Sequence, residues 1–164
     1  MSESCTLAVH RIDGGYLIRV IGKGTVQESR ALRDFVTQVL ESGSPIVLDL
    51  NDCTYLDSTF LGCVVILHQQ AKATGAVFTV WADPEIQDKL LKPSQLHQLL
   101  KFAEPPPSGL STSVELPAIA SDEREFCKHL CEAHRALAEL GGPAADTFRR
   151  IADDLSREWG DSST

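Results

Sequence analysis

Residues 47–62 carry the most structural information in this chain, and their sequence is VLDLNDCTYLDSTFLG. The apolar run at 46–50 is typical of a parallel strand that is buried on both faces of a sheet. The more polar residues that follow, at 51–57, predict a loop. Over residues 58–74 apolar side chains recur at helical spacing. The pattern therefore predicts a buried strand, a loop and a helix in that order.

The residues on either side extend this unit into an α/β domain. Two β-rich segments flank the turn Asp13-Gly14-Gly15, and a helical pattern then begins at Thr25. These further predictions are strands at 5–12 and 16–21, a helix from 25 that stops before Gly43, a strand at 77–81, and short helices at 85–91 and 95–100. The expected fold class is α/β: a small mixed sheet, antiparallel in its first hairpin and otherwise parallel, with helices packed on it.

A proline-rich segment divides this domain from a helical C-terminal part. Glu104-Pro105-Pro106-Pro107 cannot continue a helix or a central strand, because proline lacks the donor N–H. We expect a domain at 1–104, a linker at 105–120 and a hairpin of two helices at 121–164, with Gly141-Gly142 and Pro143 between the helices. The apolar stripe of the hairpin needs a cover, which is either the domain or a second copy in a homodimer.

The composition is that of a globular protein and not of a fibre or a disordered chain. Of the 164 residues 43% are hydrophobic and 23% are charged, which is enough apolar material for a core. The formal net charge of -8 argues against binding to nucleic acid or to an anionic membrane. The apolar run at 61–67 is too short to span a bilayer, and the first residues lack a signal-peptide pattern, so we expect a cytoplasmic protein.

The five cysteines are expected to be reduced thiols, because their number is odd and no secretory signal precedes them. Cys127, Cys131 and His134 follow the spacing i, i+4, i+7, which would place three potential metal ligands on one helix face. A structural zinc site needs four ligands, and cysteine often serves as a small buried hydrophobe. We therefore predict neither a metal site nor a cofactor.

Two other groups of residues suggest an enzymatic hypothesis. Asp49, Asp52 and Asp57 gather at the carboxyl end of the buried strand, where open α/β sheets bind ligands and where Mg²⁺ is conceivable. Gly22-Lys23-Gly24-Thr25 resembles a fragment of a phosphate-binding loop but lacks its full spacing. We interpret the aspartates as caps and turn formers, and the glycines as a turn into a helix that Thr25 caps. No catalytic residue is predicted.

Asp57 and Ser58 stand where the second helix must begin. Either side chain can accept a hydrogen bond from a free backbone N–H of the first helical turn, which is the role of an N-cap. Because a cap lies at the surface, its hydroxyl is also within reach of another protein. The local sequence is compatible with both roles.

The segment DSTFLG at 57–62 follows an apolar strand that contains Asp49 and precedes an apolar helix. In this position it resembles the signature of STAS domains, and specifically of single-domain bacterial anti-sigma factor antagonists. The similarity covers residues 5–102 and implies a STAS-like fold, with the hairpin at 121–164 outside the pattern. Phe60 departs from the pattern, because many members have glycine there; this side chain either joins a docking surface or tucks into the domain.

The resemblance implies a protein that regulates transcription by switching partners and catalyses no reaction. In the family a partner that is both anti-sigma factor and serine kinase phosphorylates the hydroxyl residue after the aspartate, which corresponds to Ser58, with Thr59 as the alternative. Phosphorylation would release this partner, and a metal-dependent serine phosphatase would restore binding. The expected partner-binding residues are Asp57, Ser58, Thr59, Phe60, Leu61 and Val64. The alternative function is a scaffold or ligand-binding module of a signalling assembly, without a phosphorylation cycle.

Overall fold

The structure is a computed structural model that describes residues 5–105, 110, 112–117 and 122–160. Its centre is a six-stranded mixed sheet with the order β5-β3-β2-β1-β6, and β4 pairs with β2 beside this path. The strands are β1 (Thr6–Ile12), β2 (Gly15–Gly24), β3 (Ile46–Asp49), β4 (Cys53–Leu56), β5 (Phe78–Trp81) and β6 (Val114–Glu115). The α/β fold with a mixed sheet, predicted from the sequence, is confirmed.

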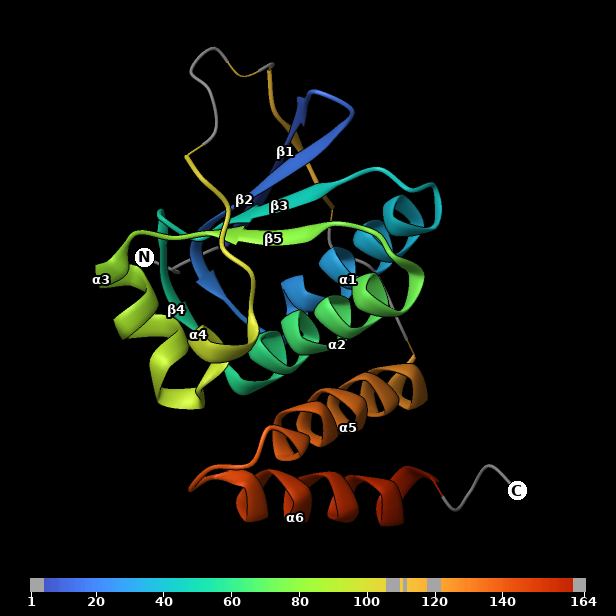
Figure 1. The fold of residues 1–164 in the computed structure, drawn as a ribbon. Helices are drawn as coiled ribbons and strands as arrows, with labels where there is room; N and C mark the ends of the chain where they lie inside the picture. The colour runs from blue at the N-terminus through green and yellow to red at the C-terminus, as the bar shows by residue number, and fades with distance from the viewer. Residues whose placement is uncertain (1–4, 106–109, 111, 118–121, 161–164) are drawn as a thin grey trace.

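The strand pairing follows the predicted order. Strands β1 and β2 form the antiparallel hairpin, and Gly14 in its turn has a left-handed φ of 75°. Strand β3 pairs parallel to β2, and β5 pairs parallel to β3. Parallel neighbours need a crossover connection, which the helices α1 (Val26–Glu41) and α2 (Ser58–Thr74) supply. Both helices lie on the same face of the sheet (Figure 1).

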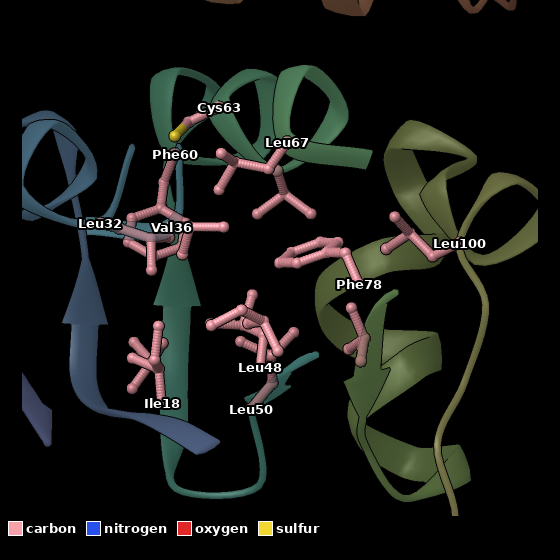
Figure 2. Packing of buried hydrophobic residues seen from close by; sticks show 14 of the residues in the cluster. Ile18, Leu32, Val36, Leu48, Leu50, Phe60, Cys63, Leu67, Phe78 and Leu100 are labelled. Carbon is pink, nitrogen blue, oxygen red and sulfur yellow. The ribbon is translucent and has the colours of Figure 1, made fainter. Parts of the chain in front are cut away.

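Apolar side chains fill the space between the sheet and these two helices (Figure 2). Ile18 and Leu48 come from the sheet, Leu32 from α1, and Phe60 and Leu67 from α2, and each is fully buried. Burial of one such side chain contributes about 1.5–3 kcal/mol of transfer free energy. This core therefore fixes α2 against the sheet.

The helix ends are set by caps that the sequence predicts. Helix α2 begins after Asp57 and ends at Gly75, which adopts a left-handed φ of 74°. Helix α1 begins after Thr25, whose backbone N–H and hydroxyl donate to the Glu28 carboxylate at 3.0 and 2.6 Å. Both crossover helices thus begin directly after a residue whose hydrogen bonds stabilise the helix N-terminus.

Three details of the sheet differ from the prediction. The segment 51–57, expected as a loop, contains β4, and Gly22–Gly24, expected as a turn, is the end of β2. These two segments pair in parallel, with a register shift between Gly22 and Lys23. Strand β6 lies within the segment 105–120 that was expected as a linker, and it pairs with β1.

Short helical turns follow β5, and two longer helices form the C-terminal part. The short elements are α3 (Pro84–Ile86), a π-helical turn (Gln87–Leu91), a 3-10 turn (Lys92–Ser94) and α4 (Leu96–Leu99). The longer ones are α5 (Glu123–Glu139) and α6 (Ala145–Leu155), with a π-helical turn after them (Ser156–Gly160). Asp122 caps α5 by accepting the backbone N–H of Glu125 at 2.7 Å.

The α5–α6 hairpin packs back onto the domain. Helix α5 lies against α2, and α6 covers α5 on the side away from the sheet (Figure 1). Of the two expected ways to cover the apolar stripe of the hairpin, the structure shows packing against the domain. The homodimer and the domain boundaries at 104 and 120 stay predictions. Among the helices in the described ranges, none combines the length and the apolar character that crossing a membrane requires.

Candidate functional site

Asp57 ties the N-termini of two helices to one carboxylate. Its Oδ1 accepts the backbone N–H of Phe60 at 2.8 Å, which caps α2. Its Oδ2 accepts the backbone N–H of Val26 at 2.9 Å, which is the first residue of α1. Its own N–H donates to the carbonyl oxygen of Gly24 at 3.0 Å. Asp57 therefore holds α1, α2 and the end of β2 in one arrangement, and the predicted capping role is confirmed.

Ser58 is half-buried at the start of α2, and its hydroxyl meets a histidine from α5. The Ser58 Oγ lies 3.0 Å from His134 Nε2, and His134 Nδ1 lies 2.7 Å from the carbonyl oxygen of Leu130. A carbonyl oxygen only accepts, so in the neutral imidazole Nδ1 carries the proton and Nε2 has the lone pair. The Ser58 hydroxyl therefore donates to His134.

The neighbours of Ser58 differ in their exposure to solvent. Thr59 is 4% exposed, and Phe60 and Val64 are fully buried. Leu61 is half-buried, like Asp57 and Ser58. Phe60 thus takes the second of its two predicted places, inside the domain, where its ring packs close to Gly24. Of the two hydroxyls at the start of α2, that of Ser58 is the more accessible.

Helices α2 and α5 approach each other closely at Gly62. A Cβ atom at this position would lie 2.1 Å from the carbonyl oxygen of Ala133. Nonbonded carbon and oxygen atoms do not approach so closely, and thus only glycine permits this contact. Gly62 is buried and Ala133 is fully buried, so α5 excludes solvent from this part of α2.

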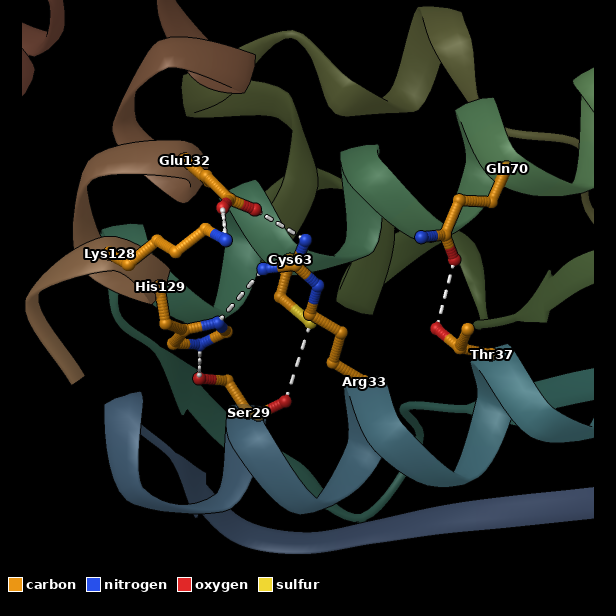
Figure 3. Close-up of polar contacts among 8 residues, drawn as sticks. All are labelled: Ser29, Arg33, Thr37, Cys63, Gln70, Lys128, His129 and Glu132. Carbon is orange, nitrogen blue, oxygen red and sulfur yellow. Dashed lines mark hydrogen bonds and ion pairs between the residues drawn. The ribbon is translucent and has the colours of Figure 1, made fainter. Parts of the chain in front are cut away.

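A second histidine of α5 contacts α1 (Figure 3). His129 is 2% exposed, and its Nε2 lies 2.7 Å from the Oγ of Ser29, whose hydroxyl donates to the carbonyl oxygen of Val26. Its Nδ1 lies 3.3 Å from Nη1 of Arg33. Burial, together with the positive charges of Arg33 and Arg30, lowers the pKa of His129 to about 4. His129 is therefore neutral in the docked hairpin at neutral pH.

Ion pairs add to the contact between α5 and α1. Arg33 donates from Nη2 to the Glu132 carboxylate at 2.5 Å, and Lys128 lies within 4.0 Å of the same carboxylate (Figure 3). Arg30 pairs with Glu125 at 3.7 Å. Partly exposed ion pairs of this kind contribute about 0.2–1 kcal/mol each. Charge complementarity thus orients the hairpin but contributes little to its affinity.

The acidic residues at the end of β3 serve the fold. Asp49 is 1% exposed, and its carboxylate accepts Nε of Arg19 at 3.3 Å and the backbone N–H of Asn51 at 2.9 Å. Asp52 lies 3.6 Å from the same arginine. Together with the capping role of Asp57, these contacts assign a structural partner to each aspartate of the hypothetical magnesium site.

The three potential metal ligands of α5 have different surroundings. Cys131 Sγ lies 3.4 Å from the carbonyl oxygen of Ala152 on α6, and His134 contacts Ser58. Cys127 is buried, and burial raises the pKa of its thiol. In the part of the chain that the structure describes, no group of three His, Cys, Asp or Glu side chains is placed to hold a metal ion.

The contributions of His129, His134 and Ser29 to this site were not predicted from the sequence. Each histidine lies on the same stripe of α5 as buried residues such as Cys127 and Ala133. That stripe signals burial, and a buried histidine needs a hydrogen-bond partner. The partners are about 76 to 100 residues away in sequence, so the helical pattern alone could not identify them.

Comparison with known proteins gives one family. Residues 8–101, more than half of the chain, match a family model described as "Mlab, STAS domain". The anti-sigma factor antagonist SpoIIAA in its unphosphorylated form is 15% identical at a TM-score of 0.49, and the match covers 60% of this chain and 88% of that one. The Bacillus cell fate determinant SpoIIAA in its phosphorylated form is also 15% identical, with a TM-score of 0.47 and coverages of 60% and 91%.

Proposed function

The chain belongs to the STAS domain family, and on this premise we propose that it is an anti-sigma factor antagonist. The unphosphorylated protein binds a partner that is both anti-sigma factor and serine kinase. Phosphorylation of Ser58 releases this partner, and a metal-dependent serine phosphatase restores the binding form. In this cycle the chain is a substrate and a binding partner, and it catalyses none of the steps.

The observation that carries the proposal is the placement of Ser58. Its hydroxyl lies at the start of α2, half-buried and turned away from the sheet, next to a residue that fixes the helix end. A kinase must bring a phosphate to this oxygen, so accessibility decides which hydroxyl can be modified. Thr59 is 4% exposed, and its modification would require α2 to move. The structure therefore favours Ser58 over Thr59 as the acceptor.

The docking surface is narrower than the six residues suggested by the family resemblance. Asp57, Ser58 and Leu61 are half-buried and offer atoms to a partner. Thr59, Phe60 and Val64 lie inside and support this surface from beneath. We therefore assign direct contact to the first three residues and a positioning role to the other three.

The switch follows from electrostatics. Phosphorylation adds about -1.5 to -2 charges at neutral pH. The new charge would stand beside the Asp57 carboxylate, in a chain whose formal net charge is already -8. A partner surface that fits the neutral hydroxyl would have to bury this charge without a counterion, which is strongly unfavourable. Binding is lost although the fold is kept.

The test is a phosphorylation reaction with purified proteins. The full chain is mixed with a candidate serine kinase and ATP, and the modified residue is located by peptide mass spectrometry. We expect one phosphate on Ser58. A phosphate on Thr59 alone would identify Thr59, and not Ser58, as the acceptor. Absence of phosphate with every candidate kinase would favour the scaffold function.

Two substitutions test the consequence for binding. Ser58→Asp should weaken the complex with the kinase by about tenfold or more, equivalent to about 1.4 kcal/mol. Ser58→Ala should retain binding, because it adds no charge. Equal affinities of the two variants, measured by calorimetry, would contradict the switch.

A further inference from the structure

We propose that the α5–α6 hairpin is a reversible cover of Ser58 and of the outer face of α2. In the closed form shown here, Ser58 keeps part of its surface exposed, but its hydroxyl is hydrogen-bonded to His134, and α5 covers the outer face of α2 around Gly62. The inference rests on the proposed function in one respect, which is that the covered face is the one a kinase or anti-sigma factor must reach. The cover itself follows from contacts within the chain.

Steric exclusion prevents a second protein from entering between α2 and α5 at Gly62. Because a Cβ at Gly62 would lie 2.1 Å from the carbonyl oxygen of Ala133, no second protein can fit between α2 and α5. Four residues before Gly62, the Ser58 hydroxyl is already hydrogen-bonded to His134. A partner that docks on this face must therefore displace α5.

The contacts that hold the cover are largely of a kind that water can replace. The buried residues of α5 are mostly small or polar: Cys127, His129, Ala133, His134, Ala136, Leu137 and Ala138. Its polar contacts with α1 and α2 are two serine–histidine hydrogen bonds, a contact between Arg33 and His129, and two ion pairs with arginines. Ala136 and Leu137 add apolar contacts with the core. In the open form, water can satisfy all of these polar groups. Leu137 is the one large apolar side chain among the buried residues of α5, so this interface separates more readily than the core between α2 and the sheet.

The α5–α6 hairpin is tethered to the domain that it covers. Strand β6 pairs with β1, which anchors the chain to the sheet only seven residues before Asp122, the cap of α5. A tethered element competes at an effective concentration that is roughly millimolar for a short connection. Weak contacts are sufficient to keep the hairpin closed against a partner at lower concentration. The same weakness lets a tightly binding partner open it.

The test uses the full chain and a chemical probe of Ser58 that needs no partner. In the Ser58→Cys variant, the rate of maleimide labelling at position 58 reports how often the cover opens, and peptide mass spectrometry separates this position from the native cysteines. The opening variant is Glu132→Lys, which turns the ion pair with Arg33 into a repulsion. The control is Glu139→Lys, an equal change of charge at an exposed position of the same helix.

We expect Glu132→Lys to accelerate labelling by about fivefold or more, equivalent to about 1 kcal/mol of docking, and Glu139→Lys to leave the rate unchanged. Equal rates in the two variants would refute the cover. With Ser58 intact, a kinase that modifies the wild type should act faster on Glu132→Lys by a similar factor. If labelling responds but that kinase acts equally on both, the cover does not control docking, and the inference is overturned.

The two proposals fail in different ways in this experiment. Absence of phosphorylation in every variant, with labelling that still responds to Glu132→Lys, would end the proposed function and leave the cover established. Labelling that ignores Glu132→Lys, with normal phosphorylation of Ser58, would end the cover and leave the proposed function in place.

Discussion

Helix α2 has two faces that are packed by different means. On the inner face Phe60, Val64 and Leu67 are fully buried against the sheet, in an interface without polar atoms from these side chains. On the outer face Ser58 and Gly62 meet α5 through a hydrogen bond and a close backbone contact. The inner interface gains free energy from apolar burial, and the outer one gains specificity from fit and hydrogen bonding.

The two faces of α2 should therefore differ in how easily their contacts are lost. An apolar interface is lost only when the domain unfolds, because water does not replace its contacts. The interface with α5 combines small buried side chains and Leu137 with serine–histidine hydrogen bonds and ion pairs. It can open while the domain stays folded, because water replaces the polar contacts and little large apolar surface is exposed. Substitutions on the two faces should therefore separate global unfolding from local opening.

The largest effect is expected on the inner face, from Phe60→Ala. Removal of a fully buried aromatic ring leaves a cavity and should lower the free energy of unfolding of the domain by about 3–5 kcal/mol. Chemical denaturation followed by circular dichroism measures this. Leu61→Ala, on the half-buried position next to it, should cost clearly less. Equal losses would mean that the inner face is not the dominant support of α2.

Asp57→Ala should come next, because it removes the cap of α2 and the contact with α1 together. We expect a loss of about 3 kcal/mol in the free energy of unfolding, roughly two charge-assisted hydrogen bonds. Asp122→Ala is the matched control: it removes one exposed cap at α5 and should cost about 1 kcal/mol. A similar cost for both variants in thermal unfolding would show that Asp57 serves only one helix.

Gly62→Ala should act on the outer face alone. The added methyl group meets the backbone of Ala133 and should weaken docking of α5 by about 2 kcal/mol, as overpacking does. The domain itself should keep its stability or gain slightly, because alanine is the better helix former by about 1 kcal/mol. Hydrogen exchange resolved by mass spectrometry should show faster exchange in α5 and unchanged exchange in the strands. Faster exchange throughout would mean that the two faces are not independent.

The smallest effect is expected from mild acid. The pKa of His129 falls from 6.5 to about 4 when the hairpin docks, so below pH 6.5 a proton binds the undocked form and not the docked one. Docking should therefore weaken as the pH falls from 6.5 towards 4, by about 1 kcal/mol at pH 5.5. The groups that face this ring are Ser29, Arg30 and Arg33 of α1 and Glu132 of α5.

Hydrogen exchange of the α5 amides at several pH values, corrected for intrinsic rates, measures this dependence. The control is His129→Gln, which keeps a hydrogen-bonding side chain without a titration in this range. Exchange in this variant should change little between pH 7 and 5.5. If both proteins respond alike, another group governs the pH dependence.

Elements with a strong local signal were predictable from the sequence. The bounds of α2 follow from Asp57 and Gly75, and the hairpin of β1 and β2 follows from its Asp-Gly-Gly turn. Strand β4 was missed because it is short and because Thr54 and Tyr55 are exposed, which leaves no alternation to detect. Its existence depends on pairing with the distant end of β2, and such pairing leaves no local pattern.

The candidate site was predictable in part for the same reason. Asp57 and Ser58 stand at a helix start, where residue type and position determine the role. The side chains that complete the site, His134 and His129, belong to a helix more than 60 residues further along the chain. The spacing of His134 with two cysteines suggested a metal ligand, but only tertiary packing shows that it faces Ser58.

The shared carboxylate of Asp57 has a consequence for any group attached to the next residue. Because α1 and α2 both begin at this side chain, the positive ends of two peptide dipoles converge there. An anion on Ser58 would lie near both helix ends, whose positive charge offsets part of its repulsion from the Asp57 carboxylate, so the fold would tolerate it. A phosphate could then be added and removed repeatedly without unfolding the protein, and the change would affect only the molecules that bind this surface.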